Sequence, residues 1–196
     1  MRLFLAADVT DEVRAWAGRV RHSVEQRKPA MGRALRWVQP EQVHVTLRFL
    51  GETEPSRAER LVAALGPGVP VAPFTFHLAT IDWFPPRGRP RVLVTTIGDG
   101  VAQMRDLKGA LDQALERAID LGPEDRGFVG HLTLARVRDQ EAAAVATMRR
   151  DLPSLAGPVP ALAVPLDHAT VYRSELSPAG PRYSVVACVP LAGTVA

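Results

Sequence analysis

Short apolar strands and amphipathic helices alternate along the chain, in an order that occurs twice. Residues 3–7 and 91–97 are apolar runs that are typical of strands. After each run comes a stretch with the three-to-four spacing of an amphipathic helix, and Thr10 is a capping residue for the first. The apolar positions of the two predicted helices are Val13, Ala17, Val20 and Val24, and Val101, Met104, Leu107, Leu111 and Leu115.

A histidine and a threonine two residues apart follow each predicted helix. Side chains alternate between the faces of a strand, so His44 shares a face with Thr46, and His131 shares one with Thr133. The offset from His44 to His131 is 87 residues, and further helical stretches are predicted at 55–65 and 140–152. The repeat favours two similar lobes. Strands and helices also alternate in ordinary α/β chains, so a fold with a parallel sheet is an alternative.

A third histidine with a threonine two residues on is His168, which precedes Thr170. No helix is predicted upstream of it, because residues 158–165 form a proline-rich, strand-like run. We therefore interpret His168 as an ordinary strand residue, outside the repeat.

The chain has 196 residues, of which 46% are hydrophobic, which fits a compact soluble enzyme without requiring one. No apolar run approaches a membrane span and no signal peptide is evident, so a cytoplasmic location is expected. The lone Cys188 lies in an apolar strand and is expected to be buried.

The formal net charge is only +3, but 22 of the 24 basic residues are arginines. Arginine binds phosphate through two parallel hydrogen bonds, so an excess of arginine suits a substrate with phosphate groups. Codon bias explains an excess over the whole chain equally well. Residues 85–91 form a basic loop beside Trp83 and Phe84, which suits a nucleotide strand and also suits a plain hairpin connection.

These motifs and their flanks resemble the two-histidine (2H) phosphoesterases, and among them the bacterial and archaeal RNA 2',3'-cyclic phosphodiesterases, also called 2'-5' RNA ligases. The resemblance covers nearly the whole chain. One departure is Gly130, where many members have a proline before the second histidine. The residues that carry the resemblance are 2–7, 37–38, 44–52, 90–93, 130–136 and 171–176.

The resemblance implies an α+β fold in which residues 1–196 form a single bilobal domain with a pseudo-twofold axis. It consists of two interleaved lobes with one motif each. Each lobe is an antiparallel sheet with outer helices, and the two motif strands are expected to face each other across a central cleft.

The motif residues suit the opening of a cyclic phosphate, which needs a base for water, an acid for the leaving oxygen and donors for the other oxygens. We expect His131 to be the base and His44 the acid, although the sequence does not fix which is which. Thr46 and Thr133 would bind the non-bridging oxygens. No metal or cofactor is required, and the resemblance implies a 2'-phosphate product.

Four further residues are candidates for substrate binding. Arg48 shares the face of His44 if the strand is unbroken, whereas Arg136 has the opposite parity to His131 and is favoured by the resemblance. Tyr172 and Arg173 are candidates to line the cleft. Phe49 and its neighbour Leu50 are expected in the core.

The expected substrate is an RNA with a 2',3'-cyclic phosphate end or a cyclic nucleotide, bound by a monomer. Three other interpretations stay open at this stage. The first alternative is 2'-5' RNA ligation by the reverse reaction, and the second is hydrolysis of another small cyclic phosphate. A metal-binding module built from His44, His131 and His168 is the weakest alternative, because threonine rather than carboxylate or cysteine accompanies each histidine.

Overall fold

The computed structural model describes residues 1–122, 124, 127–177 and 180–194. The first half of the chain forms, in order, β1 (Arg2–Ala7), α1 (Asp11–Arg27), α2 (Pro29–Ala34), β2 (Leu35–Trp37), η1 (Pro40–Gln42), β3 (Val45–Glu52), α3 (Pro55–Leu65) and β4 (Phe74–Phe84). The second half forms β5 (Val92–Ile97), α4 (Val101–Ile119), β6 (His131–Val137), η2 (Asp139–Glu141), α5 (Ala142–Met148), η3 (Arg149–Asp151), α6 (Leu152–Ala156), β7 (Ala163–Leu166), β8 (His168–Ser177) and β9 (Gly180–Pro190).

The described strands form one curled, nine-stranded antiparallel sheet, so the α+β class expected from the sequence is confirmed. Its order is β7-β4-β5-β6-β3-β1-β8-β9, and β2 pairs with the outer part of β6. The two expected sheets are thus the two halves of this path, and they meet where β3 and β6 pair through Val45 and Leu132. The motif strands lie side by side at this seam. The expectation that they face each other across a cleft is therefore wrong.

The long helices follow the predicted pattern closely. Thr10 caps α1, because its hydroxyl accepts a hydrogen bond from the Val13 N–H at 3.4 Å. Helix α4 begins after Gly100, whose φ of 86° and whose approach to Phe76 exclude a larger residue. The expected apolar residues of both helices are buried, except Val101 at the start of α4, which is half-buried.

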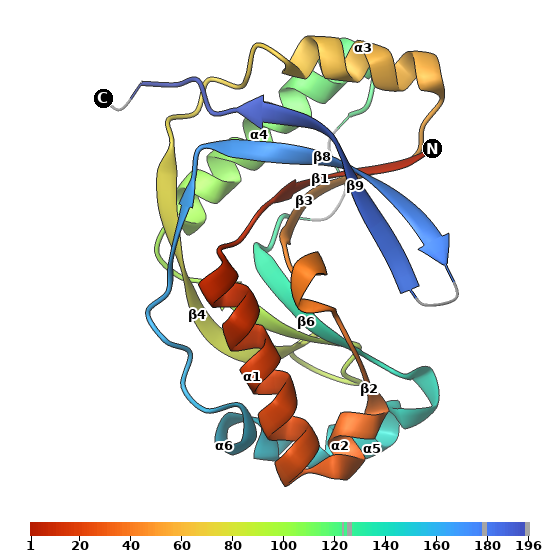
Figure 1. The fold of residues 1–196 in the computed structure, drawn as a ribbon, viewed down its shortest axis with the longest axis vertical. Helices are drawn as coiled ribbons and strands as arrows, with labels where there is room; N and C mark the ends of the chain where they lie inside the picture. Colours follow the sequence, from red (N-terminus) through yellow and green to blue (C-terminus); the bar gives the residue numbers. More distant parts are fainter. Residues whose placement is uncertain (123, 125–126, 178–179, 195–196) are drawn as a thin grey trace.

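The helices link the two halves of the sheet by crossing between them. Helix α4 follows β5 in sequence, yet it packs against β3 of the other half and against α3. Helix α1 follows β1 but lies with α2, α5 and α6 at the opposite end of the molecule, where α6 packs against β4 (Figure 1). Each half of the sheet is therefore covered partly by a helix that follows, in sequence, a strand of the other half.

The structure corrects two local expectations. The helical stretch expected at 140–152 is divided into η2, α5, η3 and α6, and Pro153 has no N–H with which a continuous helix could bond the Arg149 carbonyl. Cys188 is exposed rather than buried, because it lies on β9 at the edge of the sheet. None of the described helices is long and apolar enough to cross a membrane.

Candidate active site

Each motif strand contains one extra residue directly after its threonine. Leu47 in β3 has no partner of its own in β1, and Leu134 in β6 has none in β5. A bulge of this kind shifts the side chains that follow it to the other face of the strand. Equivalent positions of the two strands are buried to the same degree. In each strand the histidine and the threonine are half-buried, the two residues after the threonine are buried, and the next residue is exposed.

The bulges decide which residues after the motifs share the face of the histidines. Arg48 in β3 and Ala135 in β6 occupy equivalent positions and both turn into the core. Phe49 and Arg136 come next in the two strands, and both line the same cavity as the motif threonines. By simple alternation Arg136 would face away from His131, but the bulge at Leu134 brings it to the same face.

The four motif side chains come together at the seam of the sheet. Val45 and Leu132 are directly opposite each other in antiparallel strands, and both are buried. Their neighbours on either side therefore project from the other face, with His44 beside Thr133 and Thr46 beside His131, so each histidine lies next to the threonine of the other motif.

A cavity of about 320 Å³ opens on this face of the sheet. His44, Thr46 and Thr133 line it, whereas His131 is not among its lining residues and stacks its ring on Phe84, with centroids 5.8 Å apart. Among the described residues that line the cavity there are three arginines and no acidic side chain. The cavity therefore suits an anion.

The two histidines are held in the same way. The Nδ1 of His44 lies 2.7 Å from the Gln42 carbonyl oxygen, and the Nδ1 of His131 lies 2.7 Å from that of Val129. Because a carbonyl oxygen only accepts hydrogen bonds, each Nδ1 carries the proton and each Nε2 is left for proton exchange. The Nε2 of His44 lies 3.1 Å from the hydroxyl oxygen of Thr46.

The surroundings of His44 have opposing effects on its pKa. Burial is the largest effect and lowers the pKa, with Arg136 adding to the lowering. The hydrogen bond to the Gln42 carbonyl and the charge of Asp8 raise it, but the net shift is downward from 6.5. In the free protein the His44 imidazole is therefore neutral at pH 7.

Aromatic side chains surround His44, and of these only Tyr172 was a candidate from the sequence. The ring of Phe4 stacks on His44 with centroids 5.0 Å apart, and it also contacts Phe49, Tyr172 and Tyr183. Phe49 is 60% exposed within the cavity, so its expected place in the core is wrong. The bulge at Leu47 causes this, and no local pattern signals it.

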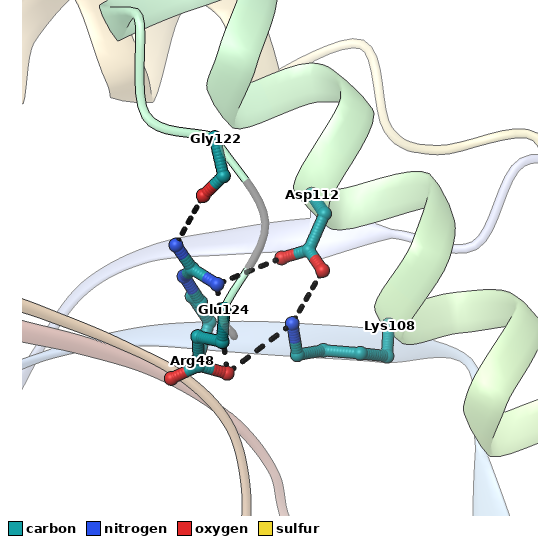
Figure 2. Close-up of polar contacts among 5 residues, drawn as sticks. All are labelled: Arg48, Lys108, Asp112, Gly122 and Glu124. Atoms are coloured by element: carbon teal, nitrogen blue, oxygen red, sulfur yellow. Dashed lines mark hydrogen bonds and ion pairs between the residues drawn. The ribbon is translucent and has the colours of Figure 1, made fainter. Parts of the chain in front are cut away.

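Arg48 is not on the motif face, which corrects the expectation from an unbroken strand. Its side chain donates to the Gly122 carbonyl and lies 3.7 Å from Asp112 and 3.5 Å from Glu124 (Figure 2). Lys108 of α4 pairs with the same two carboxylates. Arg48 therefore joins β3 to α4 and to the segment that precedes His131.

The two candidates on β8 project from different faces. The Tyr172 hydroxyl donates to Asp8 at 2.7 Å, and burial and this carboxylate raise its pKa. Tyr172 therefore lies near His44 within the cluster of aromatic rings, and its hydroxyl is hydrogen-bonded to Asp8. Arg173 instead pairs with Glu175, away from the cavity that Ser174 lines.

The third histidine with a threonine two residues on stays separate from the site. His168 pairs with Asp167 at the surface, and the Thr170 hydroxyl donates to Asp8 at 2.7 Å. Within the described parts of the chain, no group of three or more histidine, cysteine, aspartate or glutamate residues could hold a metal ion.

Comparison with known proteins identifies the class to which this fold and site belong. The model of the LigT like Phosphoesterase family matches residues 3–94 and 99–183. The chain therefore belongs to this family.

Named relatives agree with this assignment. An RNA 2',3'-cyclic phosphodiesterase of Thermus thermophilus is 34% identical, over 98% of this chain and 91% of the relative. An RNA 2',3'-cyclic phosphodiesterase of Archaeoglobus fulgidus is 32% identical, over 70% of this chain and 73% of the relative.

Solved structures share the fold. The Thermus thermophilus protein TT0787 has a TM-score of 0.73 and 28% identity, with 98% of this chain and 99% of that chain covered. The E. coli LigT structure with 3'-AMP has a TM-score of 0.71 and 22% identity, covering 97% and 98%.

The Arg48→Met variant tests the buried charge cluster. It leaves the largely buried Asp112 with only Lys108 and removes the hydrogen bond to the Gly122 carbonyl, so we expect the free energy of unfolding to fall by roughly 1 to 3 kcal/mol, the cost of leaving buried polar groups unpaired. Urea denaturation measures this change. The control Arg173→Met removes a surface ion pair and is expected to change little. Equal effects of the two variants would contradict the role given to the cluster.

Proposed function

We propose that this protein hydrolyses the 2',3'-cyclic phosphate at the end of an RNA, or of a nucleoside, to a 2'-phosphate. The observation that carries the proposal is the pair of equivalent imidazoles, each tied at Nδ1 to a carbonyl two residues back. Family membership and the names of the relatives support the same reaction. The cavity beside the imidazoles, with its arginines, fits the charge of the substrate.

In the proposed reaction His131 takes a proton from water at its Nε2 while the water oxygen bonds to phosphorus. The bond between phosphorus and the 3'-oxygen breaks, and a protonated His44 gives its Nε2 proton to that oxygen. Thr46 and Thr133 donate hydrogen bonds to the non-bridging oxygens, which carry the negative charge. The product keeps the phosphate on the 2'-oxygen, and the protons are balanced between the two imidazoles.

The acid role of His44 requires a proton that the free protein does not hold at pH 7. The lowered pKa of His44 opposes protonation, but a phosphate anion bound beside it would raise that pKa. Substrate binding and protonation of His44 are therefore coupled in this proposal. The cytoplasmic location, the monomeric state and the alternative ligation reaction stay predictions.

Substitution of the histidines tests the assignment. We expect His44→Ala and His131→Ala each to lower kcat/KM on a 2',3'-cyclic phosphate on the order of 100-fold to 10,000-fold, because each removes an acid or a base. The control His168→Ala is expected to keep most of the activity, because this side chain pairs with Asp167 at the surface and does not line the cavity. A loss in His168→Ala as large as in the other two would overturn the assignment.

The pH profiles of the single-histidine variants separate acid from base. In His131→Ala the acid His44 remains, so the residual kcat/KM should fall as the pH rises through its lowered pKa, with the loss centred below pH 6.5. His44→Ala lacks the acid, so its residual rate should not show this loss at rising pH. If the loss appears in His44→Ala and not in His131→Ala, the roles are exchanged.

The identity of the product tests the leaving oxygen. We expect a single 2'-phosphate, because the two motifs hold water and leaving group on opposite sides of phosphorus and only one ribose oxygen can meet the acid. Chromatography against 2'-nucleotide and 3'-nucleotide standards measures it. A 3'-phosphate, or a mixture of both, would contradict the proposed geometry.

A further inference from the structure

Two arginines lie directly opposite each other beside the candidate active site. Arg36 of β2 pairs in register with Arg136 of β6, and both side chains line the central cavity. Directly opposed residues of neighbouring strands project from the same face, and like charges in such a pair repel each other. Without an anion between them, this arrangement lowers the stability of the sheet.

No protein group offsets this pair of charges. Among the residues that the structure describes, no carboxylate is in ion-pair distance of either guanidinium. The cavity contains a third arginine, Arg2, and none of its described lining residues is acidic. Arg136 also contributes to the lowered pKa of His44, so its field reaches the motif residues. The charges that this surface fits are those of a polyanion.

The arginine pair is displaced from the motif threonines along the sheet. Arg136 follows Thr133 by three residues of β6, but because of the bulge at Leu134 this step spans two residues of β5, which corresponds to about 7 Å at the usual rise of a strand. A terminal phosphate held by the two threonines would therefore leave the arginine pair for a different anion. In an RNA chain, that anion is the phosphodiester on the 5' side of the terminal nucleotide.

Basic side chains continue beyond the pair. Arg136 also lines an adjoining hollow with Arg89 and Arg91 from the end of the β4–β5 connection. Arg36 lines another hollow with Arg33 and Arg138. The pair thus lies where the central cavity meets two further arginine-lined surfaces, as a path for a longer strand requires.

We infer that Arg36 and Arg136 bind the phosphodiester immediately 5' of the terminal nucleotide. The preferred substrate is then an RNA 3' end of two or more nucleotides rather than a single cyclic nucleotide. This inference rests on the proposed function and adds a subsite to it. Guanidinium groups suit this role because each offers parallel N–H donors to phosphate oxygens.

The experiment compares three substrates with the same terminal nucleoside 2',3'-cyclic phosphate. They are the mononucleotide, the dinucleotide, and the dinucleotide with an uncharged methylphosphonate in place of the internal phosphodiester. We expect kcat/KM for the charged dinucleotide to exceed that for the mononucleotide by about 10-fold or more, as for hydrogen bonds to a charged group. The methylphosphonate dinucleotide should lose that preference, because a methyl group replaces the charged non-bridging oxygen.

Variants locate the effect on the arginine pair. Arg36→Gln and Arg136→Gln should each reduce the ratio of dinucleotide to mononucleotide kcat/KM by about 10-fold. The control Arg105→Gln changes an exposed arginine of α4 and should keep the ratio. Two variants are used so that poor folding of one does not decide the result.

Two outcomes would overturn the inference. One is a wild-type protein that does not distinguish the charged dinucleotide from the mononucleotide. The other is an Arg36→Gln variant that loses equal activity on both, which would mean that the pair binds the terminal phosphate. Absence of hydrolysis of any substrate would contradict the proposed function instead. In that case fluorescence titration with the charged and methylphosphonate dinucleotides still tests the subsite, and equal affinities would overturn it.

Discussion

The candidate site depends on the single residue pair that joins the two halves of the sheet. Val45 and Leu132 are opposite each other at the seam between β3 and β6, and both side chains are buried. Because strand side chains alternate, burial of this pair turns both motifs toward the other face, where they meet. A shift of one residue in this register would place the two motifs on opposite faces of the sheet.

The bulges after the motifs then give the two halves different chemistry from the same backbone. In each half the bulge turns the first following residue into the core and the second toward the cavity. The inward position is Arg48 in one half and Ala135 in the other, whereas the cavity receives Phe49 from one and Arg136 from the other. The repeat thus supplies matched histidine and threonine side chains together with unmatched groups at the positions that follow them.

Buried charge supports this arrangement from behind the sheet. Arg48 and Lys108 face Asp112 and Glu124, and the cluster links β3, α4 and the segment before β6 (Figure 2). Ions in the interior are stable only when they are paired, so these contacts restrict how the elements pack. Both motifs are attached to the cluster, one through Arg48 on its own strand and the other through the segment that leads to His131.

The sequence by itself determined much of the local structure and the choice of candidate residues. Apolar spacing located α1, α3 and α4, and the repeated motif singled out His44 and His131 while setting His168 aside. It did not determine which neighbouring residues reach the cavity, because alternation along a strand holds only while the strand is regular. The bulges at Leu47 and Leu134, and the pairing of Arg36 with Arg136, arise between strands that are far apart in sequence. Only the tertiary structure brings those strands together, so it alone decided that Arg48 is buried and that Arg136 faces the site.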